Sequence, residues 1–224
     1  MTRGSTAVMA RRQEPPNSLD FFPTPPWATR ALLRHVLPVA LGGHHIASAW
    51  DPACGEGHMA EVLAEDIALV RGSDVFDYGR GYPVADFLDP ATRMTPPVDL
   101  IATNPPFNAA VDFADLALEQ AGAVALLLRT AWIEGDERYE RLFRERPETL
   151  FAPFVERVPM LRGRWDPDAS TATAYAWFVW VRGVAPLPVF RIPPGRKRAL
   201  TKPTDAARFA QAADIPLFSS VVPA

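Results

Sequence analysis

Apolar and polar residues follow one another along the chain in stretches that predict strands and helices in alternation. Apolar runs of strand type lie at residues 44–51, 67–74, 98–103, 123–129, 153–160 and 173–182, with a shorter extended piece at 82–88. Helical patterns lie at residues 26–37, 58–66, 108–121 and 136–147. Because strands alternate with helices, we expect an α/β fold with a mostly parallel, doubly wound sheet covered on both faces. The last two strands have no helix between them, which favours an antiparallel C-terminal pair.

The same pattern indicates one domain, residues 19–184, between two segments of different composition. Residues 1–18 are polar and indicate a flexible N-terminal arm. Residues 185–224 are rich in proline, partly basic and short of periodicity, so we expect a loosely ordered tail. A chain of 224 residues is long enough to bury one sizeable core.

Composition is that of a soluble globular protein, with 48% hydrophobic and 22% charged residues. The single cysteine, Cys54, permits no intramolecular disulfide and is expected to be a packing residue. No apolar run approaches the length that crosses a bilayer, and the N-terminus lacks the apolar core of a signal peptide. We therefore expect a cytoplasmic protein without a membrane partner. The four histidines show no metal-ligand spacing, and no metal is predicted.

Charge is distributed unevenly between the two halves of the chain. Residues 1–128 carry 8 Lys and Arg against 15 Asp and Glu, whereas residues 129–224 carry 15 against 11. The net charge of −3 argues against a strongly basic nucleic-acid binder, but the basic second half favours a polyanionic partner. Arg/Glu pairs on a solvated helix explain part of the second half equally well.

A glycine-containing turn follows the first predicted strand, from Asp51 to Gly57. Gly55 and Gly57 let the backbone turn tightly and approach a ligand, and the next helix offers unpaired N–H groups to an anionic group. Asp74 ends the next strand, where a carboxylate can bind a ribose diol. The spacing Gly55-x-Gly57-x-x-Ala60 also fits a relaxed dinucleotide motif, so this segment alone leaves S-adenosylmethionine and NAD as alternatives.

The sequence Asn104-Pro105-Pro106-Phe107 follows the strand predicted at residues 98–103. Two prolines fix the backbone and donate no hydrogen bonds, so the corner displays acceptors: the Asn104 side-chain oxygen and the Pro105 carbonyl. Two rigid acceptors can bind both hydrogens of a conjugated amine such as adenine N6 and favour the pyramidal geometry of methyl transfer. Phe107 can stack on a base taken out of its helix. The corner therefore favours methyl transfer over hydride transfer.

With this corner, residues 51–57 and the upstream sequence FFPTPPW, the chain resembles the class I S-adenosylmethionine-dependent methyltransferases that modify conjugated nitrogens. It is most similar to DNA adenine-N6 methyltransferases, in particular the small orphan enzymes often encoded by phages and prophages. The resemblance covers about residues 20–183. It implies a Rossmann-like fold and S-adenosyl-L-methionine as cofactor.

The resemblance also implies roles for individual residues. Expected cofactor contacts are Phe22, Thr24, Asp51, Ala53, Gly55, Gly57 and Asp74, with Asp86 and Phe87 beside the cofactor adenine. The expected catalytic residues are Asn104, Pro105, Pro106 and Phe107. The order of motifs matches the γ arrangement, which normally continues into a large target-recognition domain. Only about 40 residues follow the last strand here, which argues against strong sequence specificity.

Several further residues are candidates for contacts with nucleic acid. Arg162, Arg164 and Trp165, in a loop between the last strands, suit phosphate and base contacts, and Arg129 ends an apolar strand. A solvated loop and an ion pair are the alternatives. Residues 196–198, Arg-Lys-Arg, are a possible phosphate clamp. The sequence ending at Phe218, Ala-Asp-Ile-Pro-Leu-Phe, is similar to peptides that bind a replication sliding clamp.

The predicted function is methyl transfer from S-adenosylmethionine to adenine N6 in DNA. Three alternatives stay open: an RNA base or a protein glutamine amide as acceptor, a non-catalytic nucleic-acid-binding or phage-assembly protein with the same fold, and an NAD oxidoreductase. The acidic pI of 5.8 favours a protein acceptor, whereas the basic second half favours nucleic acid.

Overall fold

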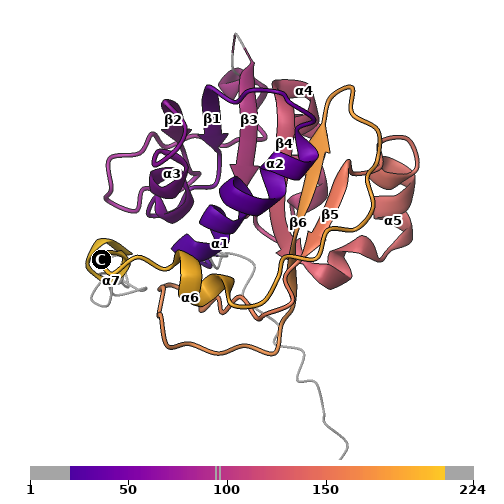
Figure 1. The fold of residues 1–224 in the computed structure, drawn as a ribbon. Helices are drawn as coiled ribbons and strands as arrows, with labels where there is room; N and C mark the ends of the chain where they lie inside the picture. The colour runs from indigo at the N-terminus through magenta and orange to yellow at the C-terminus, as the bar shows by residue number, and fades with distance from the viewer. Residues whose placement is uncertain (1–20, 94, 96, 210–224) are drawn as a thin grey trace, which may run out of the picture.

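The computed structural model describes residues 21–93, 95 and 97–209. The predicted arm, residues 1–18, and the clamp-like sequence ending at Phe218 lie outside the described residues. Six strands form one sheet in the order β2-β1-β3-β4-β6-β5 (Figure 1). They are β1 Ser48–Asp51, β2 Leu69–Gly72, β3 Val98–Thr103, β4 Ala121–Arg129, β5 Leu150–Pro153 and β6 Tyr175–Val181.

The directions of the strands confirm the predicted fold class. The pairs β1/β2, β1/β3 and β3/β4 are parallel, whereas β4/β6 and β5/β6 are antiparallel. The extended piece expected at residues 82–88 pairs at a single position, a parallel bridge between Val84 and Asp74. The result is a parallel sheet closed at one side by an antiparallel pair.

Helices cover both faces of this sheet (Figure 1). The α-helices are α1 Pro26–Ala31, α2 Leu37–Ala40, α3 His58–Leu63, α4 Ala110–Gln120, α5 Asp136–Arg138, α6 Arg196–Leu200 and α7 Asp205–Phe209. A π-helical turn, Leu32–Val36, joins α1 to α2, and another, Tyr139–Phe143, continues α5. Shorter 3₁₀ turns lie at Pro90–Thr92 and Thr130–Ile133. None of these helices has the length and hydrophobicity that a bilayer-spanning segment needs.

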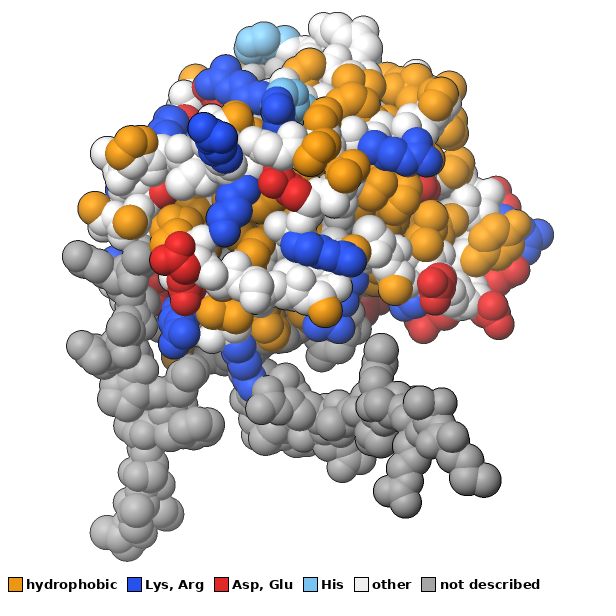
Figure 2. All heavy atoms as spheres, turned by 60° about the horizontal axis from the view of Figure 1, so that its bottom comes forward, with side chains coloured by type: hydrophobic (Ala, Val, Ile, Leu, Met, Phe, Trp, Pro, Cys, Tyr) orange, Lys and Arg blue, Asp and Glu red, His pale blue; other side chains and the backbone are white. Residues whose placement is uncertain are grey.

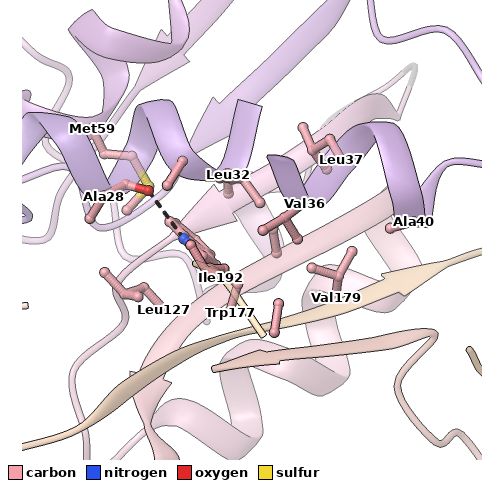
Figure 3. Packing of buried hydrophobic residues seen from close by; sticks show 14 of the residues in the cluster. Ala28, Leu32, Val36, Leu37, Ala40, Met59, Leu127, Trp177, Val179 and Ile192 are labelled. Carbon is pink, nitrogen blue, oxygen red and sulfur yellow. Dashed lines mark hydrogen bonds between the residues drawn. The ribbon is translucent and has the colours of Figure 1, made fainter. Parts of the chain in front are cut away.

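Alternation along the strands divides the core into two layers. In β3, Leu100 packs beneath α1 and α2, whereas its neighbour Ile101 packs beneath α4. In β6, Trp177 and Phe178 divide in the same way, since successive strand side chains point to opposite faces. Figure 3 shows the first layer, in which the Trp177 indole N–H donates to the Ala28 carbonyl of α1 at 3.2 Å. That bond satisfies the one polar group of a fully buried ring.

The strand predicted at residues 153–160 is misplaced. The strand that pairs with β6 is β5, Leu150–Pro153, and the chain leaves the sheet beyond Phe154. Val158 and Met160 are nevertheless buried in the core layer beneath α1. An apolar run that is buried as a loop has the same composition as a strand, so hydrophobicity alone did not separate the two.

The segment after β6 differs from the expected loosely ordered tail, because residues 185–209 pack on the domain. The backbone N–H groups of Leu187, Phe190 and Ile192 donate to carbonyls of residues 149–153, at 2.7, 3.1 and 2.9 Å. This segment therefore covers the outer edge of β5, which would otherwise leave unpaired backbone groups exposed. Prolines interrupt the segment, which explains why no periodicity revealed it.

A buried ion network fixes the end of this segment. Arg30 of α1 is 4% exposed and binds Asp205, which is fully buried, at 2.6 Å. The same guanidinium binds Glu65 at 2.8 Å, and Arg30 is the main cause that lowers the pKa of Glu65 to about 2. Lys202 and Arg208 also contact Glu65. Helix α1, the residues after α3 and helix α7 are thus held together by one group of charges.

We expect Asp205→Ala to destabilise the protein by about 3–5 kcal/mol, because it leaves the buried Arg30 charge only partly compensated. A matched control is Asp66→Ala, which breaks a pair with Arg34, whose side chain is 59% exposed, and is expected to cost less than about 1 kcal/mol. Denaturant unfolding measures both values. Equal losses in the two variants would show that the buried network does not hold the tail.

Candidate active site

A pocket of about 330 Å³ opens at the carboxyl edge of the parallel strands. Three loops and the segment before α1 form its walls, as expected at this edge of an open α/β sheet. Its lining includes nine of the predicted site residues: Phe22, Thr24, Asp51, Ala53, Asp74, Asp86, Phe87, Asn104 and Pro106. The topology therefore brings together residues that lie up to 84 positions apart in the sequence.

Gly55 and Gly57 shape the pocket without lining it. Both have positive φ angles, +53° and +89°. A Cβ atom at Gly55 would lie 2.3 Å from the Phe21 ring, and one at Gly57 would lie 2.2 Å from the Tyr82 hydroxyl oxygen. The two positions require glycine for both backbone conformation and space.

The Asp51 carboxyl group is almost completely buried, at 1% exposure, and its Oδ1 atom has no hydrogen-bond partner. Burial raises the pKa of Asp51 to about 7, and the nearby Asp74 carboxylate acts in the same direction. A buried acceptor without a partner at a pocket wall is available to a donor group of a ligand.

Asp74 holds the glycine turn in place. Its Oδ2 atom accepts from the Gly55 N–H at 2.8 Å, and its Oδ1 atom accepts from the Phe76 N–H at 3.1 Å. Each oxygen keeps a second lone pair, and the residue lines the pocket. Burial raises the pKa of Asp74, which the backbone donors partly oppose.

The Asn104 side chain has a fixed orientation at the tip of β3. Its Nδ2 group donates to the Phe22 carbonyl at 2.8 Å and contacts the Met160 sulfur at 3.7 Å. A carbonyl only accepts hydrogen bonds, so the amide nitrogen must face Phe22. The Asn104 Oδ1 atom is buried and has no partner. The amide therefore keeps its oxygen as an uncommitted acceptor.

Two side chains pack against the Phe107 ring, which is partly exposed. The Arg129 guanidinium carbon lies 4.3 Å from the centre of the Phe107 ring, and the Phe22 ring centre lies 5.6 Å away. Arg129 therefore contacts a predicted catalytic residue. Neither Phe107 nor Pro105 lines the pocket itself, although both adjoin Pro106, which does.

Asp86 and Phe87 line another part of the pocket. The Asp86 carboxylate accepts from the Leu88 N–H at 2.9 Å, which shapes the turn. Phe87 packs edge-on against Trp50, with ring centres 5.2 Å apart, and also against Phe113. This wall joins the pocket directly to the core layer beneath α4.

The loop predicted to contact nucleic acid divides into two parts. Arg162 and Arg164 are exposed, and between them the Gly163 N–H donates to the Phe21 carbonyl at 2.9 Å, which places the loop against the pocket. Trp165, in contrast, is only 5% exposed and packs against Phe209. The expectation that Trp165 stacks on a base is corrected here, because its ring is used in packing the tail.

Residues of no predicted role also line the pocket, among them Phe21, His58 and Tyr78. Burial lowers the pKa of His58 to about 4, so the ring is neutral, and its Nε2 atom donates to the Phe209 carbonyl at 3.1 Å. Burial likewise raises the pKa of the Cys54 thiol, which agrees with a packing role. The glycine turn next to His58 could have indicated that this residue lies at the pocket. No sequence pattern indicated the same for Tyr78. Within the described ranges, no group of three or more His, Cys, Asp or Glu residues could hold a metal ion.

No family model matches the sequence, and the search of curated proteins gave no match. Several solved structures have a similar shape. The methyltransferase subunit of a type I restriction-modification system from Streptococcus thermophilus matches 72% of this chain at 14% identity and a TM-score of 0.53. This chain spans 45% of that subunit's length.

Two further structures match more of their own length. One is a candidate class I S-adenosylmethionine-dependent methyltransferase from Listeria monocytogenes. The match covers 83% of this chain and 68% of the Listeria chain, at 13% identity and a TM-score of 0.51. A candidate RNA methyltransferase from Pyrococcus horikoshii matches 75% and 90%, at 16% identity and a TM-score of 0.50. This chain has the class I methyltransferase fold. At these identities the likeness establishes the fold alone.

We expect Asp51→Asn to stabilise the protein in a pH-dependent way. The pKa of Asp51 is raised from an ordinary value near 4 to about 7, so the native state binds this proton more tightly than the unfolded state. The contribution is complete below pH 4 and is lost as pH rises to 7, by up to about 1.4 kcal/mol per pH unit. The advantage of the Asn variant should grow over this window and then level off. Unfolding of both proteins from about pH 4 to about pH 9 measures it, and a constant difference would contradict it.

Proposed function

We propose that this protein transfers a methyl group from S-adenosylmethionine to the exocyclic N6 amino group of adenine in DNA. The observation that carries the proposal is the orientation of Asn104. Its nitrogen is committed to the Phe22 carbonyl, so the uncommitted atom at the strand tip is an acceptor oxygen. An amine with two hydrogens to donate is the group that such a corner can recognise.

The pocket has features that suit S-adenosylmethionine. Asp51 and Asp74 would accept hydrogen bonds from its ammonium and ribose hydroxyl groups, since both line the pocket and Asp51 Oδ1 lacks a partner. Phe22 and Phe87 supply apolar surface, and the glycine turn lets the side chains of Phe21 and Tyr82 pack closely against its backbone. The fold neighbour from Listeria monocytogenes has a name that specifies the same cofactor. When bound, this cofactor supplies an electrophilic methyl group.

In this proposal the chain's own residues position the amine and make its nitrogen nucleophilic. Asn104 Oδ1 and the Pro105 carbonyl accept the two N6 hydrogens. Because both acceptors are rigid, they favour the pyramidal nitrogen of the transition state over the planar ground state. The nitrogen–carbon bond then forms as the carbon–sulfur bond breaks, and the nitrogen releases one proton to water. No residue with a shifted pKa is needed as a base.

Access to the Phe107 ring requires the side chain of Phe22 or of Arg129 to move, while the Phe22 backbone carbonyl stays bonded to Asn104. Asn104 Oδ1 is closed to solvent, and Phe22 contacts both Asn104 and Phe107. The Arg129 guanidinium also lies over the Phe107 ring. An incoming base would therefore displace Phe22 or Arg129 before it stacks on Phe107, which favours a base already taken out of its helix.

We expect Asn104→Ala to reduce methyl transfer by about 10²–10³-fold, because it removes one preorganised acceptor. Cofactor affinity should change less than about threefold, since the loss acts mainly in the transition state. Asn108→Ala deletes an amide elsewhere in the same pocket and should cost less than tenfold. Turnover with labelled cofactor and calorimetric titration of the cofactor measure the two effects.

The same assay identifies the acceptor. Unmethylated DNA, RNA and a cell lysate are incubated separately, and mass spectrometry locates the modified group. Methyl-adenine in DNA supports the proposal. A methylated RNA base or glutamine amide would keep the chemistry of the corner and replace the acceptor. Cofactor binding without turnover on any of these would favour a non-catalytic protein, and unchanged turnover in Asn104→Ala would overturn the mechanism.

A further inference from the structure

Many basic side chains of the described structure pair with acidic neighbours. Arg141 contacts Asp112 and Asp115, and Arg30, Lys202 and Arg208 share Glu65. A cation in such a pair has much of its field cancelled and is part of the fold. These residues are therefore poor candidates for binding a polyanion.

Five other cations of the described structure, from two segments of the chain, have no acidic partner of this kind. They are Arg157, Arg191, Arg196, Lys197 and Arg198, and within the part of the chain that the structure describes none of them pairs with a carboxylate. Arg196 contacts the His35 ring at 3.3 Å, and because a guanidinium only donates, His35 Nε2 must accept. Three of the five, Arg157, Arg191 and Arg198, are exposed. We call these five residues the basic surface.

Tertiary structure brings these residues together from two segments. Phe154 forms a bridge with Ile192, and the Val155 N–H donates to the Ile192 carbonyl at 3.1 Å. The Glu156 carboxylate accepts from the Lys197 backbone N–H at 2.8 Å. This bond ties the segment that carries Arg157 to the start of α6. Figure 2 shows basic side chains across the face that turns forward there, spread among uncharged side chains and some acidic ones.

The basic surface lies close to the proposed catalytic corner. Met160, whose sulfur lies 3.7 Å from Asn104 Nδ2, follows Arg157 by three residues, so their Cα atoms are at most about 11 Å apart. Lys197 lines a small cavity with Pro25, next to pocket-lining Thr24. Successive phosphates of one strand rise about 3.4 Å along a duplex, so the surface lies within a few nucleotides of the corner.

We propose that the basic surface binds the phosphate backbone of the nucleic acid that flanks the target base. This inference rests on the proposed function and adds to it where the substrate lies. Phosphate contacts orient a nucleic acid but carry no sequence information. The basic surface would therefore add affinity for nucleic acid of any sequence.

The test uses the full chain and a fluorescently labelled oligonucleotide of about 20 nucleotides, titrated at several salt concentrations. In the double variant Arg191→Gln/Arg198→Gln, we expect binding about tenfold weaker or more and a log–log salt slope smaller by about two. The matched control is Arg93→Gln/Arg144→Gln, which removes two exposed arginines that pair with Glu119 and Glu140. The control should bind as the parent protein does.

Two readouts separate this inference from the proposed function. Calorimetric titration of the cofactor should give the same affinity in all variants, which shows that the fold is intact. Asn104→Ala should bind the oligonucleotide like the parent protein while its turnover is lost. Binding that depends on the basic surface without turnover on DNA supports the inference and contradicts the proposed function. Turnover on DNA with an unchanged salt slope in the Arg191/Arg198 variant overturns the inference alone.

Discussion

The ion network around Arg30 is the constraint on which the rest of the structure depends. Arg30 lies in α1, and its guanidinium binds Glu65, just after α3, and Asp205 in α7. The segments that lead into α1 and α3 form two walls of the pocket. Breaking one partner away would leave a charge buried without compensation, which is costly. The network therefore fixes the spacing of the pocket walls and keeps the C-terminal segment on the domain.

That segment reaches the pocket as well as the sheet. Phe209 packs against Trp165, and its carbonyl accepts from His58, a residue of the pocket lining. Residues 187–192 cover the edge of β5, and the next residues carry the basic surface. One short stretch of chain thus closes the sheet, supports the glycine turn and displays unpaired positive charge.

The proposed chemistry needs few groups, but it needs them rigid. An acceptor oxygen is useful only if its amide cannot flip, and the Phe22 carbonyl prevents the flip of Asn104. The same hydrogen bond ties the catalytic corner to the segment that also contacts Phe107. Substrate access, amide orientation and the pocket wall are therefore coupled through residues 21–24. This coupling explains why an aromatic and proline-rich sequence precedes α1.

The sequence alone determined the sheet, its parallel order and the residues at its carboxyl edge, because strand periodicity and the turns after Asp51 and Thr103 are local signals. Nine predicted site residues line one pocket, and five of them, Phe22, Thr24, Ala53, Asp86 and Phe87, were expected from the family resemblance alone. Tertiary structure decided the rest. The sequence left Trp165 available to stack on a base, but in the folded chain it packs against Phe209. Residues 153–160 resembled a strand, but the structure buries Phe154, Val158 and Met160 in a loop. Pairing of Arg30 with Asp205, 175 residues apart, depends on contacts that no local pattern encodes. Whether a side chain is buried, paired or available is a property of its neighbours in space, and those are set only when the chain is folded.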